Sequence, residues 1–303
     1  MKAAIYFNEL QPLLYGYYIC KGVIFLHRKI SVAVFTVLTA MFMCGCTSDK
    51  NTVGQSAGHN NRGGRTPAET AFLTDGKEKV CYGQGYETDS DNRPVGAIQA
   101  QEKYGSYGGR IIFGKDVKTI RLTFDEGYEN GCTGKILDIL KEKKVTATFY
   151  VTLDYVKSSP ELVQRMINEG HEVGNHSCTH PSLPDISDDM VFEEIHGLET
   201  YISDNFGGYK TVTMRPPRGE FSVRTLRIAK NMGYDTVLWS FAYNDWNTDA
   251  QPDRDTAYRR ITSATHNGAV YLLHAVSETN TAILPDVIDY WLDNGYTVKS
   301  ISG

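Results

Sequence analysis

From residue 117 onward, short apolar segments are each followed closely by polar or charged residues, and this repeated placement constrains the fold most strongly. The five polar clusters are 125–127, 175–180, 215–219, 245–246 and His274. Apolar runs of this length, bounded by turn residues, are typical of buried strands in parallel sheets. In a barrel of parallel strands the carboxyl ends meet on one face, where catalytic residues gather. The pattern therefore predicts an enzyme with its site at that face.

Helix signals alternate with these strands. Ser159 before Pro160, Ser187 before two aspartates, and Ser222 have the character of helix N-termini. Further helices are expected at 135–143, 256–265 and 281–294. Strands are expected at 119–124, 146–152, 171–175, 211–215, 235–240, 268–273 and 296–300. About seven strand–helix repeats favour an α/β fold, a distorted or incomplete (β/α) barrel with about seven parallel strands, over a doubly wound sheet.

Residues 1–46 have the character of an export leader. His27-Arg28-Lys29 precedes an apolar segment, 30–43, which is short for a membrane span and suits a signal peptide. The following residues 43–46 resemble a lipobox, in which Cys46 would carry lipid at the mature N-terminus. An ordinary signal peptide and an uncleaved anchor are the alternatives. We expect an exported protein that is anchored on the extracytoplasmic face of the membrane.

Composition divides the rest of the chain. Residues 47–66 are rich in Asn, Gly, Ser and Arg and predict a flexible linker. Residues 67–116 carry no clear helix and predict a strand-and-loop extension, and 117–303 form the catalytic domain. The leader has four basic residues and one acidic residue, so the net charge of −5 for the chain becomes −8 beyond it. This charge excludes a nucleic-acid partner, and a monomer is expected. Three of the six cysteines lie beyond the leader, so no disulfide framework follows.

His176 and His180 are candidate metal ligands. Pro181 disfavours helix at His180, so the pair is expected on a loop. Two neutral imidazoles and one carboxylate can hold a divalent ion and leave a position open for water, although two histidines at this spacing also occur by chance. In the pair Asp125-Glu126, one carboxylate can bind metal while the other takes a proton. The alternative for that pair is a charged turn.

The remaining candidates follow the later strands. Arg215 can hold an ionised carboxylate through paired hydrogen bonds, or form a surface salt bridge instead. His274 ends an apolar run, where a histidine is more often a core residue. Asp245 can orient and tune His274, and Trp246 is either a core residue or a wall on which a sugar stacks. Each signal is weak alone, and their joint order along the chain gives them weight.

That order resembles the polysaccharide deacetylases with a NodB-homology domain, carbohydrate esterase family 4, over roughly residues 117–301. The similar segments are 123–127, 176–180, 215–219, 245–246 and 272–274. Within the family, segments 128–131 and 271–274 and the arginine at 218 are most similar to the delta-lactam-biosynthetic de-N-acetylases of spore cortex peptidoglycan.

The resemblance implies metal-dependent removal of acetyl groups from N-acetylmuramic acid in a peptidoglycan glycan strand. Asp125 would be the general base and His274 the general acid. Arg215 would keep Asp125 ionised, and Asp245 would support protonated His274. The metal ligands would be His176, His180 and Glu126, with zinc the expected ion.

Two residues depart from the family pattern. Glu126 stands where the family has an aspartate, and Arg218 where it has a tyrosine. The Arg218 guanidinium matches the lactyl carboxylate of peptide-free muramic acid. Alternatively, Arg218 pairs with Asp125, Glu126 or another acid of the cleft. The alternatives for the whole protein are a deacetylase of N-acetylglucosamine in peptidoglycan or chitin-like glycans, an acetylxylan deacetylase, and a catalytically inactive glycan-binding barrel.

Overall fold

The computed structural model describes residues 76–303. The expectations for the leader, for Cys46, for the linker and for residues 67–75 lie outside this range. Within 76–303, no helix has both the length and the apolar composition needed to cross a bilayer.

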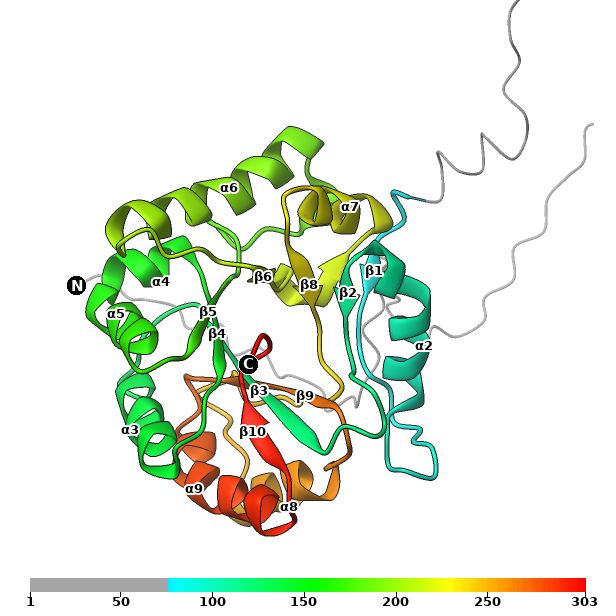
Figure 1. Cartoon of the computed structure of the whole chain (residues 1–303), viewed down its shortest axis with the longest axis vertical. Helices are drawn as coiled ribbons and strands as arrows, with labels where there is room; N and C mark the ends of the chain where they lie inside the picture. Colours follow the sequence, from blue (N-terminus) through cyan, green and yellow to red (C-terminus); the bar gives the residue numbers. More distant parts are fainter. Residues whose placement is uncertain (1–75) are drawn as a thin grey trace, which may run out of the picture. The chain divides into compact units, whose positions relative to one another are not determined.

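Eight parallel strands form one curved sheet in the described part of the chain (Figure 1). The order is β10-β3-β4-β5-β6-β8-β2, and β9 pairs with the other edge of β3. Seven strands coincide with the expected ones, and β2 is additional. The strands are β2 (Gly109–Arg110), β3 (Thr119–Glu126), β4 (Thr148–Val151), β5 (Glu172–Asn175), β6 (Thr213–Met214), β8 (Asp235–Val237), β9 (Ala269–His274) and β10 (Thr297–Lys299).

The sheet curls into a barrel that is only partly closed. The segment after β8 and strand β9 do not form a continuous ladder, and only a few backbone hydrogen bonds join them. Ser240 N–H donates to the Val270 carbonyl at 2.9 Å, and Leu272 N–H donates to the Phe241 carbonyl at 2.9 Å. The expected distorted or incomplete (β/α) barrel is therefore confirmed.

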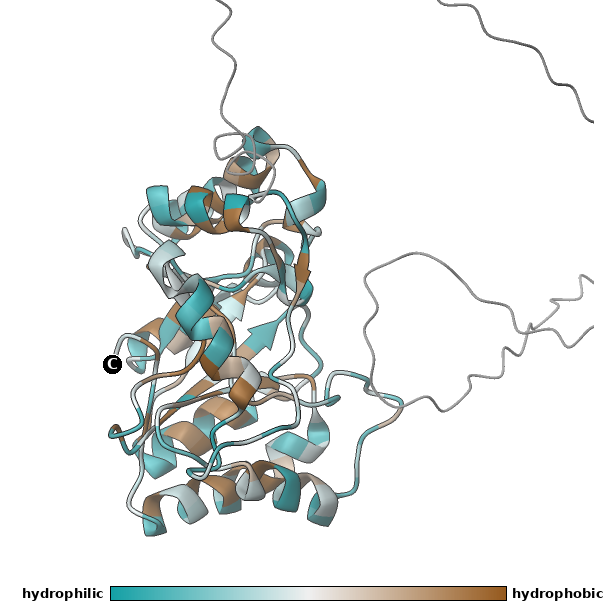
Figure 2. Ribbon diagram, turned by 90° about the vertical axis from the view of Figure 1, so that its right-hand side faces the viewer, coloured by the Kyte–Doolittle hydropathy of each residue, from teal (hydrophilic) through white to brown (hydrophobic). Residues whose placement is uncertain are grey.

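The helices that connect the strands lie around the outside of the sheet (Figure 1). Their ribbons alternate between apolar and polar colouring, as amphipathic helices do (Figure 2). Ser187 and Ser222 cap α6 and α7 as their sequence predicts, because each hydroxyl accepts a backbone N–H three residues later. The helices are α3 (Thr133–Lys143), α4 (Leu153–Ser158), α5 (Pro160–Asn168), α6 (Asp188–Asn205), α7 (Val223–Asn231), α8 (Arg254–Ser263) and α9 (Glu278–Asp293).

Strand β3 shows how the sheet separates core from site. Ile120, Leu122 and Phe124 are completely buried and share one cluster with residues of α3 and α9. Each such burial stabilises the fold by about 1.5–3 kcal/mol. Because successive side chains of a strand point to opposite faces, Asp125 faces the barrel interior instead.

The N-terminal extension contains a helix that its sequence did not suggest. Besides β1 (Val80–Cys81), which pairs antiparallel with β7 (Glu220–Phe221), it forms α2 (Val95–Tyr104). The expectation of strands and loops alone was wrong here, because the buried face of α2 consists of Ala97, Ala100 and Tyr104. Two of these three residues are alanines, so the sequence of this segment shows little apolar periodicity.

Candidate active site

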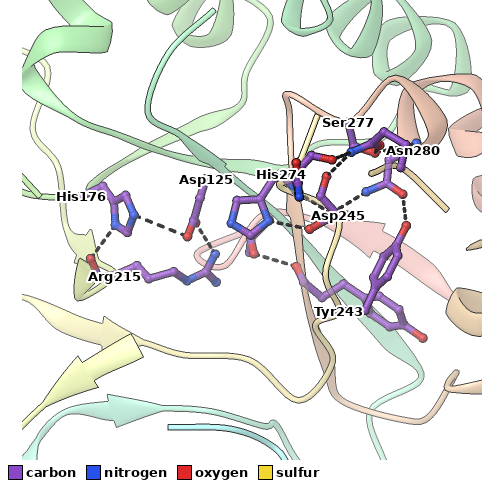
Figure 3. A network of polar contacts seen from close by, with 12 residues as sticks. Asp125, His176, Arg215, Tyr243, Asp245, His274, Ser277 and Asn280 are labelled. Atoms are coloured by element: carbon purple, nitrogen blue, oxygen red, sulfur yellow. Dashed lines mark hydrogen bonds and ion pairs between the residues drawn. The ribbon is translucent and has the colours of Figure 1, made fainter. Parts of the chain in front are cut away.

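Asp125 and His274 are lateral neighbours at the carboxyl ends of β3 and β9. In the parallel ladder, Asp125 pairs with His274 on one side and with Tyr150 of β4 on the other. Neighbouring strands lie about 4.8 Å apart, so side chains at paired positions on one face meet. Figure 3 shows the two side chains in one row with His176 and Arg215.

Arg215 follows β6 and reaches Asp125 from across the barrel. Its Nη1 donates to Asp125 Oδ1 at 2.7 Å, and its other nitrogens donate to the carbonyls of Val237 and Leu238 at 3.3 Å. The guanidinium lies 4.3 Å from the centroid of the Tyr150 ring and is completely buried. These contacts hold the guanidinium in one position, and Asp125 with it.

His176 and His180 lie together on the loop after β5, with ring centroids 4.9 Å apart. His176 Nδ1 lies 2.8 Å from the carbonyl oxygen of Arg215. A carbonyl only accepts, so Nδ1 carries the hydrogen and Nε2 is left with its lone pair. That Nε2 lies 3.5 Å from Asp125 Oδ2.

Hydrogen bonds fix the backbone of this loop in an unusual conformation. Ser177 and His180 have φ values of 67° and 59°, which non-glycine residues seldom adopt. The Ser177 hydroxyl accepts the His180 N–H at 3.0 Å. Glu194 of α6 accepts from the N–H and the hydroxyl of Thr179 at 2.8 and 2.6 Å. These bonds offset a strain of about 1–3 kcal/mol per residue.

Burial and neighbouring charged groups determine the protonation states of Asp125, His176 and His180. Burial, above all, lowers the pKa of His176, and burial followed by the nearness of His176 lowers the pKa of His180 to about 4. Both imidazoles are thus neutral near pH 7, the form that binds metal. Burial alone would raise the pKa of Asp125, but the charge and hydrogen bond of Arg215, together with the charge of His274, outweigh burial and lower that pKa. Asp125 is therefore ionised.

His274 is held by Asp245. Its Nδ1 donates to Asp245 Oδ1 at 2.7 Å, and its backbone N–H donates to Oδ2 at 2.9 Å. Burial lowers the pKa of His274, but the charge and hydrogen bond of Asp245, together with Asp125, outweigh burial and raise it. His274 can therefore carry a proton.

Glu126 lies on the opposite face of β3 from Asp125. Its carboxylate is buried and accepts from the Thr133 hydroxyl of α3 at 3.3 and 3.4 Å. Burial, and then the charge of Glu129, raises the pKa of Glu126 well above its usual range. Glu126 still belongs to β3 and pairs with Val151 of β4. Because successive side chains of a strand point to opposite faces, Glu126 points away from the face that carries Asp125. The structure does not bring Glu126 to the histidines.

The histidine pair by itself fits a divalent cation. Both imidazoles are neutral, and a carbonyl holds Nδ1 of His176, as is usual for a metal-binding histidine. Within residues 76–303, no three His, Cys, Asp or Glu side chains are grouped so as to hold a metal. The expected set of three ligands is therefore not assembled.

Arg218 and Trp246 are both exposed. Arg218 belongs to the short 3-10 helix η3 (Pro217–Gly219), has a left-handed backbone with φ 60°, and is exposed. Among the described residues it forms no hydrogen bond or ion pair, so the pairing with Asp125 or Glu126 is not observed. Its charge adds to burial in lowering the pKa of His180. Trp246 follows Asp245 and is 51% exposed.

The sequence did not identify Tyr150, Glu194 or Asn280 as part of the site, although the Asn280 amide donates to Asp245 Oδ2 at 2.5 Å. Tyr150 lies within an apolar strand, and the other two lie within helices, where such residues are common for structural reasons. Their partners are distant in sequence, so no local signal marks them.

Comparisons with known proteins identify the family of this chain. The family model described as polysaccharide deacetylase matches residues 114–237. The chain is 45% identical over 200 residues to the peptidoglycan-N-acetylmuramic acid deacetylase PdaA of Bacillus subtilis, covering 66% of this chain and 75% of that protein. It is 33% identical over 187 residues to the peptidoglycan-N-acetylglucosamine deacetylase PgdA of Listeria monocytogenes, covering 62% of this chain and 39% of that protein.

The solved structure of Bacillus subtilis PdaA, described as a family 4 carbohydrate esterase, superimposes with a TM-score of 0.71 at 39% identity. The match covers 75% of this chain and 96% of that one. A chain that shares the fold and so much sequence with that esterase belongs to the polysaccharide deacetylase family and is a hydrolase acting on amide bonds.

Proposed function

We propose that this protein removes the acetyl group from N-acetylmuramic acid in peptidoglycan. The observation that carries the proposal is the row of Asp125, Arg215 and His274 at one edge of the barrel, in which an ionised carboxylate faces a proton-carrying imidazole. The similarity to PdaA of Bacillus subtilis supports the substrate.

In this proposal the two side chains move protons in opposite directions. Asp125 takes a proton from the water that attacks the amide carbon, because Arg215 keeps the carboxylate ionised. His274, held in its protonated form by Asp245, donates a proton to the amine nitrogen as the C–N bond breaks. Acetate and a free amino sugar are the products. A matched base and acid each contribute typically 10²–10⁴-fold to the rate.

His176 and His180 would hold the divalent ion, for which we propose zinc. When bound, the ion polarises the amide carbonyl and makes water more acidic. Removal of metal by a chelator is expected to abolish turnover, and zinc is expected to restore it. Titration calorimetry with the His176→Ala, His180→Ala double variant should show no binding at this site. Unchanged binding in that variant would place the metal elsewhere.

Arg218 supports muramic acid as the substrate. Muramic acid differs from glucosamine by a lactyl ether, which presents a carboxylate when no peptide is attached, and a guanidinium binds carboxylates through two hydrogen bonds. Such a contact supplies about 1.5–3 kcal/mol, which corresponds to a preference of about tenfold to a hundredfold. Arg218→Tyr should lower kcat/KM on muramic residues by that factor and leave kcat/KM on N-acetylglucosamine oligomers almost unchanged.

The second candidate is a deacetylase of N-acetylglucosamine. The similarity to PgdA of Listeria monocytogenes favours it. An equal loss on both substrates in Arg218→Tyr, or a wild-type preference for N-acetylglucosamine, would support this candidate over the first. An inactive glycan-binding barrel is the third, and acetate release from either glycan would exclude it.

We further propose that the product leads to muramic delta-lactam in the spore cortex and that the protein acts as an exported, membrane-anchored monomer. The free amine and the lactyl carboxylate lie on one sugar, and their condensation closes the lactam ring. Anchoring follows from the expected lipid on Cys46. Cys46→Ala should release the protein from the membrane fraction without changing its activity, and unchanged fractionation would contradict this anchor.

A further inference from the structure

The Asp245 carboxylate is completely buried and accepts three hydrogen bonds. Two come from His274, at 2.7 Å to Oδ1 and 2.9 Å to Oδ2. The third comes from Nδ2 of Asn280 in the first turn of α9, at 2.5 Å to Oδ2. Among the described residues, His274 is the only cationic side chain that pairs with Asp245. Among those residues, the neutral Asn280 amide is therefore the one other side-chain partner of the Asp245 carboxylate, and His274 and Asn280 share the negative charge of that carboxylate.

The orientation of the Asn280 amide follows from its two neighbours. An ionised carboxylate only accepts, so the NH₂ group must face Asp245. The amide oxygen then faces the hydroxyl of Tyr243, with which it forms a short hydrogen bond (Figure 3). A carbonyl oxygen only accepts, so Tyr243 must donate. Burial, and then the charge of Asp245, raises the pKa of Tyr243 far above its usual value and keeps that proton in place.

The surroundings hold both members of the pair. The Asn280 N–H donates to the hydroxyl of Ser277, the N-cap of α9, at 3.0 Å. The Tyr243 side chain is buried, and the Arg260 guanidinium of α8 lies 5.5 Å from its ring centroid. Neither side chain contacts the row at Asp125, so their link to the chemistry runs through Asp245.

We propose that Asn280, oriented by Tyr243, is a positioning residue for the general acid: it fixes the Asp245 carboxylate against His274 and takes up part of its negative charge. Donation by Tyr243 polarises the amide and strengthens its N–H bond to Asp245. A weaker donor at this position would leave more charge on Asp245 for His274. His274 would then hold its proton more tightly and be the poorer acid.

His274 is also faced by Asp125, whose charge strengthens its hold on the proton, and by Arg215, which weakens it. His176 is a further ionisable neighbour. These three groups stay in place when Asn280 is replaced. A change in the proton affinity of His274 is then due to Asp245.

The inference rests on the proposed function for the role of His274, but its test does not require turnover. The test is the NMR titration of histidine side chains in the full-length protein, with the His274 signal identified from a His274→Gln sample. Asn280→Leu removes the donor with little change in volume, and should raise the His274 midpoint by about half a pH unit or more, about threefold in proton affinity. Tyr243→Phe should raise it by less.

Thr281→Val is the matched control. Thr281 lies in the same turn of α9 and its buried hydroxyl donates to the Ser277 carbonyl at 2.8 Å, without contacting Asp245. This variant should lose stability and keep the wild-type midpoint. An unchanged or lower midpoint in Asn280→Leu, or the same shift in Thr281→Val, would overturn the inference. If Asn280→Leu does not fold, Tyr243→Phe decides, and an unchanged midpoint there has the same meaning.

The two proposals fail separately. A raised midpoint in a protein that releases no acetate would reject the proposed function and keep the positioning role. Acetate release by a protein whose His274 midpoint does not change in Asn280→Leu would keep the proposed function and reject the positioning role of Asn280.

Discussion

Gly174 keeps the active-site row in place by leaving room for Tyr150. A Cβ atom at position 174 would lie 2.5 Å from Cε1 and 2.6 Å from Cδ1 of Tyr150. Ordinary carbon contacts are about 3.5–4.0 Å, so Gly174→Ala must displace the ring by about 1 Å. The ring cannot yield freely, because its hydroxyl donates to Thr213 at 3.2 Å and the guanidinium of Arg215 lies over it.

The expected cost follows from these contacts. Overpacking of a buried site costs about 1–3 kcal/mol, and the lower entropy of unfolded alanine offsets about 0.4–1 kcal/mol of this. We expect a net loss of about 1–2 kcal/mol in the free energy of unfolding. We also expect kcat/KM to fall by about tenfold to a hundredfold, because the displaced ring moves Arg215 and thereby Asp125.

Urea denaturation and initial rates of acetate release measure the two effects. Gly134→Ala is the control, because its Cβ would meet only Leu162 Cδ2 at 4.0 Å. That variant should have unchanged activity and equal or slightly higher stability. Tyr150→Leu in the Gly174→Ala background should restore stability without restoring activity. Wild-type stability and rate in Gly174→Ala would refute the role given to Tyr150.

Three further predictions concern metal binding and pH. Glu126→Gln should leave zinc affinity within about threefold of the wild type by calorimetry, because its carboxylate faces α3. Glu194→Ala should weaken zinc binding by about tenfold to a hundredfold, since it removes both bonds to Thr179 beside the histidine pair. Burial lowers the pKa of His266 to about 4 in the folded protein. As the pH falls, His266 therefore takes up a proton at a higher pH in the unfolded state than in the folded state. The free energy of unfolding should therefore fall by up to about 3 kcal/mol between about pH 6.5 and 4, and His266→Gln should flatten this slope.

Each of these has a contrary outcome. Loss of zinc binding in folded Glu126→Gln would make Glu126 a ligand. Wild-type zinc affinity in Glu194→Ala would mean that the loop with His176 and His180 keeps its conformation without the two hydrogen bonds from Thr179 to Glu194. An unchanged slope with pH in His266→Gln would assign the acid sensitivity to other groups, such as His171, whose pKa burial also lowers to about 4.

The barrel was predictable because its signals are local. Apolar runs ending at Asp125 and His274 identify strands, and Ser187 and Ser222 identify helix starts through the hydrogen bonds that a hydroxyl can accept. Helix α2 was not predictable in this way, because alanines at Ala97 and Ala100 bury little apolar surface.

The residues that meet around Asp125, namely His176, Arg215 and His274, were among those that the sequence singled out, whereas the position of Glu126 was not predictable. The motif places Asp125 and Glu126 side by side in sequence, yet strand parity sends them to opposite faces. Asn280 and Tyr243 escaped notice because their role depends on a contact between residues 37 positions apart. Such contacts follow from packing, which no local pattern records.

The measurement that tests the central claim most directly is mass spectrometry of peptide-free peptidoglycan strands after incubation with the purified, zinc-loaded protein. Muramic residues are expected to lose the mass of one acetyl group, and folded Asp125→Asn and His274→Ala variants are expected to remove it at least about a hundredfold more slowly. Intact acetyl groups with the wild-type protein, or a wild-type rate with folded Asp125→Asn, would contradict this claim.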